Sequence, residues 1–194
     1  MKTAIKLILF SLLLFGISVE ALDWTARLEL RDSSTAPPNC QPACSTSSTT
    51  QLGGGVTSTI YLMTPEWGLF TGALLRQRGL SFTGGAGPAA TVTYLDFDVP
   101  LAIQWAAGSF AARFGVDLAA KLSSTYSVGT LANNESDKGL ITPVEVALDW
   151  KFTQNQLVNI AFESGVGVAT GIGLASPGNL ATANIITLGY GYLF

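Results

Sequence analysis

Apolar and polar residues alternate one by one along six stretches of this sequence, and two further stretches, 55–63 and 66–76, show a weaker alternation with apolar residues on both faces. In the last of the eight, "ANIITLGYGYLF", an apolar residue occupies every second position from Ile186 to Phe194. Successive side chains of a strand point to opposite faces, so this period indicates strands with one apolar face. The eight stretches span residues 22–31, 55–63, 66–76, 94–105, 110–122, 142–152, 157–169 and 183–194.

The charge content indicates where the apolar faces of these strands lie. Only 12 % of the residues are charged and 48 % are hydrophobic, whereas soluble domains contain about 25 % charged residues. After Ile17 no apolar run approaches the roughly 20 residues of a transmembrane helix. A closed β-barrel is the other structure that satisfies every backbone group in hydrocarbon. The sequence therefore predicts an all-β fold, an eight-stranded antiparallel up-and-down transmembrane β-barrel.

A soluble, lipocalin-like barrel is the alternative, with its apolar residues inside and its charges outside. Its surface would need more charged residues than this chain supplies. The apolar faces also carry aromatic residues near the strand ends, as the interfacial girdles of membrane barrels do. Both observations favour the membrane barrel. The aromatic residues are Trp24, Trp67, Trp105, Trp150, Tyr192 and Phe194.

The connections between the predicted strands alternate in length. Long links rich in Ser, Thr, Gly, Asn and Pro alternate with short links, as in outer-membrane barrels. With an even number of strands, both termini lie at the short-turn, periplasmic rim. The long links are predicted at 32–55, 77–91, 123–140 and 170–183, and the short ones near 64–65, 106–108 and 153–156.

The N-terminal residues have the three-part layout of a secretory signal. Lys2 and Lys6 precede an apolar run that ends near Gly16, and the small residues Val19 and Ala21 follow it. This layout predicts a signal peptide over residues 1–21 and a mature barrel domain over 22–194, exported through the periplasm to the bacterial outer membrane. An N-terminal membrane anchor is the alternative, for which the apolar run is short.

The ending "LGYGYLF" resembles the β-signal of bacterial outer-membrane proteins, with Leu188, Tyr190, Tyr192 and Phe194 at the matching positions. The resemblance implies that the barrel assembly machinery reads this strand, which then pairs with the first strand. The order of "YLDFDVPLAIQW", "FAARFGVDLAAKL" and "VEVALDWKF" is similar to the small eight-stranded OmpA-like and OmpX-like barrels. This likeness covers nearly all of the mature chain except the first long loop. A vaguer likeness is to porin-like major outer-membrane proteins of predatory bacteria.

Most charges of the mature chain fall on the inward face of the predicted strands. The interior of an eight-stranded barrel is just wide enough for side chains, and a buried charge without a partner is costly. We therefore expect a structural network of salt bridges and water. An ion path lined by the same groups is the alternative. The predicted interior charges are Arg27, Glu29, Arg31, Arg76, Asp96, Asp98, Arg113, Asp117, Lys121, Glu145, Asp149, Lys151 and Glu163.

Catalytic, cofactor, metal and nucleic-acid sites are not expected. The chain contains no histidine, and outer-membrane lipases, acyltransferases and proteases resemble one another in needing one, so we predict neither an enzyme nor a cofactor. Asp96 and Asp98 share a face and could hold a cation or do acid–base work, but their expected partners are Arg113 and Lys121 on the next strand. Cys40 and Cys44, in the loop 32–55, are predicted to form a disulfide, because export favours oxidation and the C-x-x-x-C spacing closes a short ring. A metal site there would need more ligands. The net charge of −3 suggests no nucleic-acid partner.

One wall of the predicted barrel has small outward residues, namely Ala26, Ser58, Thr71 and Ala73. In lipid, small residues mark places where protein packs on protein, which suggests a homo-oligomer; a thin stretch of lipid-facing wall is the alternative.

The sequence therefore leaves three roles open. They are a structural or surface-interaction barrel, a porin-like channel for small solutes, and an oligomeric, lipid-binding assembly.

Overall fold

A computed structural model describes residues 22–36, 44–62, 64–84, 90–128, 131–135, 140–169 and 180–194. These residues form strands and turns. Among them, no helix is long and apolar enough to cross a membrane. The predicted signal peptide (1–21) and Cys40 lie outside the described residues, as does the side chain of Cys44, so the disulfide stays a prediction.

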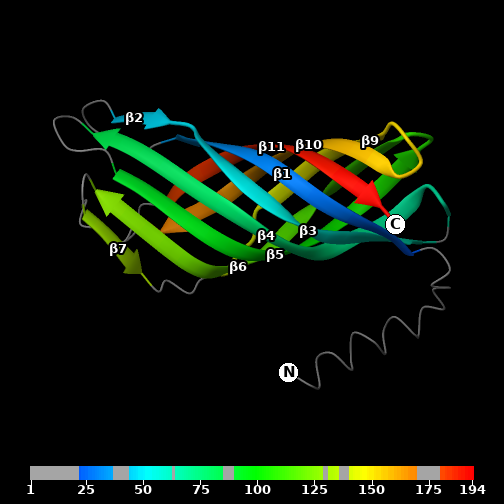
Figure 1. Cartoon of the computed structure of the whole chain (residues 1–194), viewed down its shortest axis with the longest axis horizontal. Helices are drawn as coiled ribbons and strands as arrows, with labels where there is room; N and C mark the ends of the chain where they lie inside the picture. The colour runs from blue at the N-terminus through cyan, green and yellow to red at the C-terminus, as the bar shows by residue number, and fades with distance from the viewer. Residues whose placement is uncertain are drawn as a thin grey trace, which may run out of the picture.

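Eight antiparallel strands form a closed barrel (Figure 1). Each strand pairs with the next, and the last pairs with the first. The predicted fold is therefore confirmed. The barrel strands are β1 (Leu22–Ala36), β3 (Thr49–Tyr61), β4 (Trp67–Gly84), β5 (Ala90–Ala107), β6 (Phe110–Val128), β9 (Val144–Lys151), β10 (Gln156–Ala169) and β11 (Leu180–Leu193). Three short strands lie beside them: β2 (Cys44–Ser47) on β4, and β7 (Leu131–Glu135) and β8 (Leu140–Ile141) on β6.

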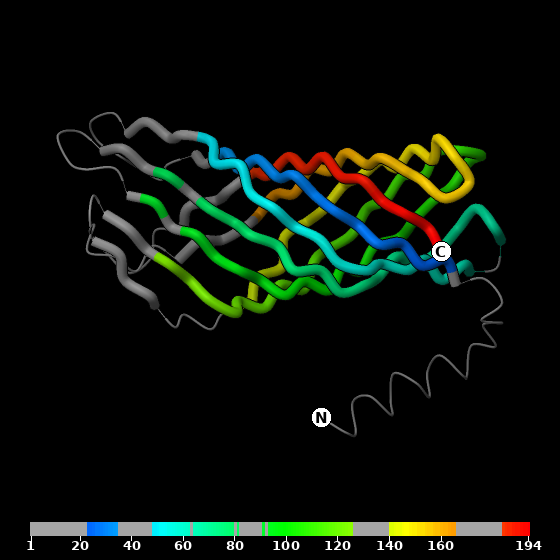
Figure 2. The backbone as a smooth tube through the Cα atoms, viewed as in Figure 1, coloured from blue at the N-terminus to red at the C-terminus, as the bar shows by residue number. Residues whose placement is uncertain are grey.

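The C-terminal strand closes the barrel. In the β1–β11 ladder, Leu28 faces Tyr190 and Leu30 faces Leu188. The backbone N–H of Phe194 donates to the carbonyl of Trp24 at 3.1 Å. The C-terminus therefore lies at the same end as the three short connections (Figure 2). At the connection between β5 and β6, Gly108 has a φ of 59°, a left-handed conformation that glycine adopts at little cost.

Several strands are longer than the sequence predicted. The predicted loops 32–55, 77–91, 123–140 and 170–183 each begin or end inside a strand; β4 runs to Gly84 and β6 to Val128, for example. The apolar alternation stops where the outer face leaves the lipid. The backbone ladders continue beyond that point because they require no apolar side chain. The prediction of these boundaries was therefore wrong.

The outer face carries an apolar band with two different borders. Towards the short turns it ends in a ring of exposed aromatic residues that includes Trp24 and Trp67. Towards the long connections it ends at exposed polar residues such as Asp32 and Gln77. The spans Trp24–Asp32 and Trp67–Gln77 are close to the roughly 9–11 residues that a membrane-crossing strand requires. The barrel wall therefore has the outer surface of a transmembrane barrel.

The wall changes character between β3 and β4. Their ladder ends where Gly53 faces Arg76, although β3 continues along β1 and β4 continues along β5. In the described part of the chain, no ladder joins residues 49–52 to residues 77–80. Side chains fill this seam from within. Thr49 and Gln51 donate hydrogen bonds to the carbonyl of Gly79 at 2.9 and 3.1 Å.

Candidate functional site: the charged interior of the barrel

The predicted interior charges point into the barrel. Twelve of the thirteen side chains are at most 9 % exposed, and Lys151 is half-buried at one end of the interior. One further cation, Arg78, is 2 % exposed. It was missed because it was assigned to the loop 77–91, although the period of two continues from Arg76 to Arg78. With Arg78 included, seven cations share the interior with seven carboxylates.

Arg76 lies at the centre of this network. Its guanidinium donates to both carboxylate oxygens of Glu29, at 2.8 and 3.0 Å. It also donates to Asp117 at 2.5 Å, Glu145 at 3.3 Å and Asp98 at 3.4 Å. The inward Gly53 leaves room for these groups, because an added Cβ would lie 3.1 Å from both Arg76 Cγ and Glu29 Oε2. Planar, bidentate contacts of this kind suit arginine better than lysine.

Two more arginines extend the network around Glu163. Arg78 contacts Asp96 at 2.6 Å, Asp98 at 2.8 Å and Glu163 at 3.1 Å. Arg31 and Glu163 form an ion pair in which neither side chain is exposed to solvent. We call these groups the central cluster. Its members are Glu29, Arg31, Arg76, Arg78, Asp96, Asp98, Asp117, Glu145 and Glu163.

A second group, the rim cluster, lies between the central cluster and the short-turn end. It consists of Arg27, Phe70, Arg113 and Asp149. Asp149 accepts contacts from Arg27 at 2.9 Å and from Arg113 at 3.2 Å. Both guanidinium carbons lie over the ring of Phe70, 5.0 and 3.9 Å from its centroid. Arg113 also reaches Glu145 at 3.9 Å, so the two clusters are connected.

The expected partners of Asp96 and Asp98 were partly wrong. Lys121 does lie opposite Asp96 in the β5–β6 ladder, and its ammonium is 4.4 Å from the ring centroid of Tyr94. Arg113, however, binds Asp149 rather than either aspartate. Arg76 and Arg78 reach the two aspartates from β4, the preceding strand. Alternation predicts the face on which a side chain lies, but long arginines choose among several neighbouring strands.

Three carboxylates of the central cluster are close enough to suggest a metal site. One oxygen from each of Asp117, Glu145 and Glu163 lies within 4.8 Å of the others. Arg76 contacts all three carboxylates, at 2.5, 3.3 and 3.4 Å. The guanidinium therefore occupies the place that a cation would take, and the carboxylates are explained by the arginine.

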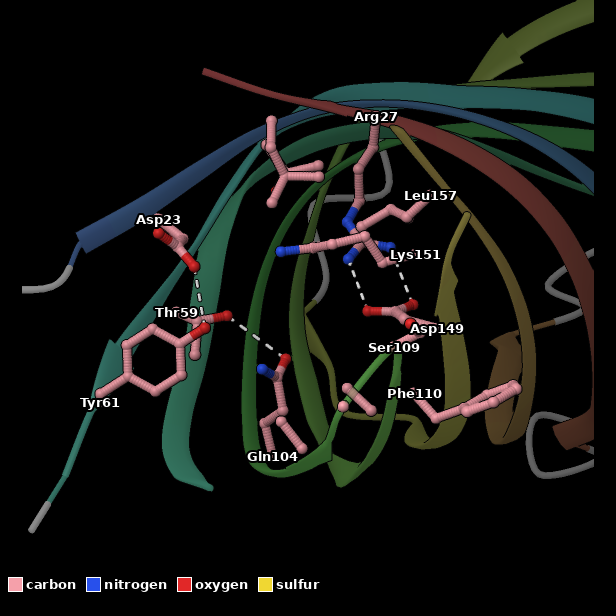
Figure 3. Close-up of a pocket in the computed structure, with 15 residues that line it drawn as sticks. Asp23, Arg27, Thr59, Tyr61, Gln104, Ser109, Phe110, Asp149, Lys151 and Leu157 are labelled. Carbon is pink, nitrogen blue, oxygen red and sulfur yellow. Dashed lines mark hydrogen bonds and ion pairs between the residues drawn. The ribbon is translucent and has the colours of Figure 1, made fainter. Parts of the chain in front are cut away.

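A polar cavity of about 90 Å³, the rim cavity, opens at the short-turn end of the interior (Figure 3). The Tyr61 hydroxyl donates to Asp23 at 2.8 Å on one wall, and Thr59 donates to Gln104 at 3.3 Å. Arg27 and Asp149 of the rim cluster form its floor. Lys151 and Ser109 also line it. This cavity combines open space with charged groups.

The outward residues of the small-residue wall differ in exposure. Ala26 and Ala73 are exposed and Thr71 is half-buried. Ser58 is only 4 % exposed, although its neighbours Thr57 and Thr59 point inward. It faces Trp24 on one neighbouring strand and Thr71 on the other. Ser58 therefore offers little surface to a partner.

The β-signal residues Leu188, Tyr190, Tyr192 and Phe194 are exposed on the outer face of β11 and at the end of the chain.

Comparison with known proteins identifies the fold. No protein-family model matches the sequence, and no curated protein matches it significantly. Neisserial surface protein A matches the structure with a TM-score of 0.54 at 8 % identity, over 89 % of this chain and 97 % of that protein. The attachment invasion locus protein Ail of Yersinia pestis, solved with the heparin analogue sucrose octasulfate, gives 0.51 at 10 % identity over the same shares. The chain therefore has the fold of the small eight-stranded outer-membrane β-barrels.

Proposed function

We propose that this protein is an outer-membrane barrel that is closed to ions and acts through the surface it exposes outside the lipid. The single observation that carries the proposal is the central cluster. It ties together side chains from β1, β4, β5, β6, β9 and β10 across the interior. The interior of an eight-stranded barrel leaves little space beside such side chains.

The energetics of buried ion pairs support a closed interior. An ion that passes through the barrel would have to separate Arg76 from its carboxylates. Removal of one partner of a buried ion pair costs about 3–5 kcal/mol. In addition, Phe70 and the two arginines over its ring occupy the path between the rim cavity and the central cluster. Two successive barriers therefore oppose conduction.

The lengths of the strands support a role outside the lipid. β4 and β5 contain 18 residues each and β6 contains 19, whereas about 9–11 residues cross a membrane. Beyond the apolar band these strands continue as a sheet, to which β2 and β7 add. Such a projecting sheet is a surface for a partner. The proposal contains no catalytic step, since the chain has no histidine to act as an acid or base.

The route to the membrane is part of the proposal. The signal-like residues 1–21 would direct export, and the barrel assembly machinery would read Leu188, Tyr190, Tyr192 and Phe194. Replacement of Phe194 by Asp should then block assembly in the outer membrane while export continues. Heat-modifiable gel mobility of membrane fractions measures the folded barrel, and a normal yield of the variant would contradict this route.

Recording of single channels in planar bilayers tests the closed state. The native barrel should give no stable current, whereas Arg76→Met should give measurable openings, because it frees the carboxylates at the centre. The matched control is Gln77→Met, whose side chain lies on the outer face of the adjacent position and should leave the barrel silent. A steady conductance of the native protein would contradict the proposal.

A porin-like channel for small solutes is the second candidate, and one observation favours it. The rim cavity leads into the interior from the short-turn end and is lined by polar groups, as a channel entrance would be. A steady native current, changed in ion selectivity by Asp149→Asn, would favour this candidate over the closed barrel.

A further inference from the structure

We propose that the rim cavity is a binding site for a small oxyanion, such as phosphate, sulfate or a carboxylate, with Lys151 as its main ligand. The inference goes beyond the proposed function, because an anion can bind at the mouth of the barrel whether or not the interior conducts. It rests on the charges around the cavity, on the donors that line it, and on its size.

The carboxylates around the rim cavity already have partners. Asp149, on the floor of the cavity, is shared by Arg27 and Arg113, so its charge is not left over for a further cation. The carboxylate of Asp23 is engaged by the Tyr61 hydroxyl at 2.8 Å. Among the described residues, no carboxylate lies within 4.0 Å of the Lys151 ammonium. The interior therefore ends in a cation that no carboxylate of the described strands and turns neutralises.

The position of Lys151 also favours an anion in the rim cavity. Lys151 is the last residue of β9 and points inward, half-buried, into the cavity (Figure 3). A lysine at a strand end could extend into the solvent, where its charge is hydrated at no cost. Here part of that hydration is lost to burial. A bound anion would compensate for the loss, because charge-assisted hydrogen bonds are the strongest that an ammonium makes.

Neutral hydrogen-bond donors line the rim cavity together with Lys151. Gln104 accepts a hydrogen bond from Thr59 through its carbonyl oxygen at 3.3 Å, which leaves its amide NH₂ as a donor. Ser109, in the connection between β5 and β6, adds a hydroxyl to the lining. An ammonium, an amide and a hydroxyl around one space are the donors that an ion with several oxygens can use together. A monatomic anion would leave most of them without an acceptor.

The size of the cavity limits the ligand to a small ion. Its volume is about 90 Å³, well below the roughly 300–1,000 Å³ of pockets that hold drug-sized ligands. An inorganic phosphate, a sulfate or an acetate suits a cavity of this size better than a nucleotide. A phospholipid headgroup carries the same phosphate chemistry. It would have to enter from the rim with its glycerol attached, so a free oxyanion fits better.

Isothermal titration calorimetry of the full barrel in a phosphate-free, non-ionic detergent tests the site. Sodium phosphate is titrated against sodium chloride at equal ionic strength, and the carbon signals of the lysine side chains are followed by NMR. We expect saturable phosphate binding, a shift of the Lys151 signal and no saturable heat with chloride. A separate titration with a short-chain phosphatidylglycerol distinguishes the lipid as the source; tighter binding of this lipid than of phosphate would overturn the assignment to a free oxyanion.

Three variants sharpen the test, and gel mobility checks that each one folds. Lys151→Met should weaken phosphate binding about tenfold or more, as expected for the loss of a charge-assisted hydrogen bond. Asp23→Asn should strengthen binding about threefold, because it removes a nearby negative charge. Lys121→Met, far from the cavity beside Tyr94, is the matched control and should bind as the native protein does. If Lys151→Met failed to fold, Gln104→Leu should still weaken binding. Equal binding by Lys151→Met, or weaker binding by Asp23→Asn, would overturn the site.

Discussion

The central cluster and the rim cavity contain the same kinds of side chain in the same barrel, yet they differ in how completely the charges are matched. In the centre, Arg76 alone contacts five carboxylates at 3.4 Å or less. At the rim, Lys151 faces open space instead of a carboxylate. The difference shows that paired charges fill the interior and hold the walls of the barrel together. A cation without a carboxylate partner can instead bind an anion from solution.

The backbone contributes to this difference. Around the central cluster, the inward position of Gly53 is filled by the side chains of Arg76 and Glu29. At the rim, the side chains around Lys151 leave the cavity of about 90 Å³ between them. The interior is therefore packed in the middle and open at the short-turn end. Substitutions at the two places should have different consequences, which can be measured as stability and as conductance.

The largest effect is expected for Arg76→Met, which removes the centre of the network. Five carboxylates would lose their common partner, and the barrel should lose about 3–5 kcal/mol of stability to unfolding. Urea unfolding in lipid vesicles, followed by tryptophan fluorescence, measures the loss. Asp117→Asn combined with Arg76→Met should recover part of it, because one uncompensated charge is then removed. If Arg76→Met were as stable as the native protein, the central cluster would not stabilise the barrel more than the rim does.

Phe70→Ala tests the boundary between the two regions. The ring packs against Arg27 and Arg113, so its loss should cost about 3 kcal/mol through the cavity it leaves and the lost cation–π contacts. Brief openings in planar bilayers should also appear. Phe110→Ala is the control, since this exposed phenylalanine lies on the outer face. Openings in the control but not in Phe70→Ala would show that the barrier to ion conduction does not lie at Phe70.

Asp149→Asn should have a smaller effect on stability, of about 1–3 kcal/mol. The amide keeps a hydrogen-bond acceptor for Arg27 and Arg113 but removes the charge that both share. Unfolding in urea at low and high salt measures the change, and high salt should reduce it because added ions screen the two arginines. An effect larger than that of Arg76→Met would show that the rim cluster, and not the central cluster, dominates stability.

The smallest effect is expected for Lys151→Met, which should change the unfolding free energy by less than about 1 kcal/mol, in the range of exposed charges. In the described part of the barrel the lysine has no carboxylate partner that its loss would leave unpaired, and water reaches the cavity. The same urea unfolding experiment in phosphate-free buffer checks this. A loss of stability comparable to that of Arg76→Met would mean that Lys151 stabilises the barrel as much as the central cluster does.

The sequence predicted which face of the barrel wall a side chain occupies better than it predicted which residues that side chain contacts. The alternation around Arg113 and Asp149 was sufficient to place both inside, because one face of each strand must satisfy lipid. Their mutual contact was not predictable, since a guanidinium on a long side chain reaches across more than one strand. The cavity beside Lys151 could not be predicted either, because it depends on how far the side chains of seven strands extend.

The ends of the strands were the second feature that the sequence did not predict correctly. Arg78 was assigned to a loop because the regular apolar pattern on β4 ends near Leu75, where the outer surface leaves the lipid. The ladder nevertheless continues to Gly84, held by backbone hydrogen bonds that leave no trace in side-chain type. The same reason explains the early start of β3 at Thr49. Apolar periodicity therefore measured the thickness of the membrane rather than the length of the barrel.

The seam between β3 and β4 has a consequence for the motions of the wall. Where two strands share a ladder, one amide is exposed only when several neighbouring bonds break together. At residues 49–52 and 77–80 the facing edges are joined by side chains of Thr49 and Gln51 instead, and these can rotate one at a time. Local opening there requires less free energy than unfolding of the whole barrel. Amide hydrogens along this seam should therefore exchange with solvent deuterium earlier than those of the β5–β6 ladder at the same height.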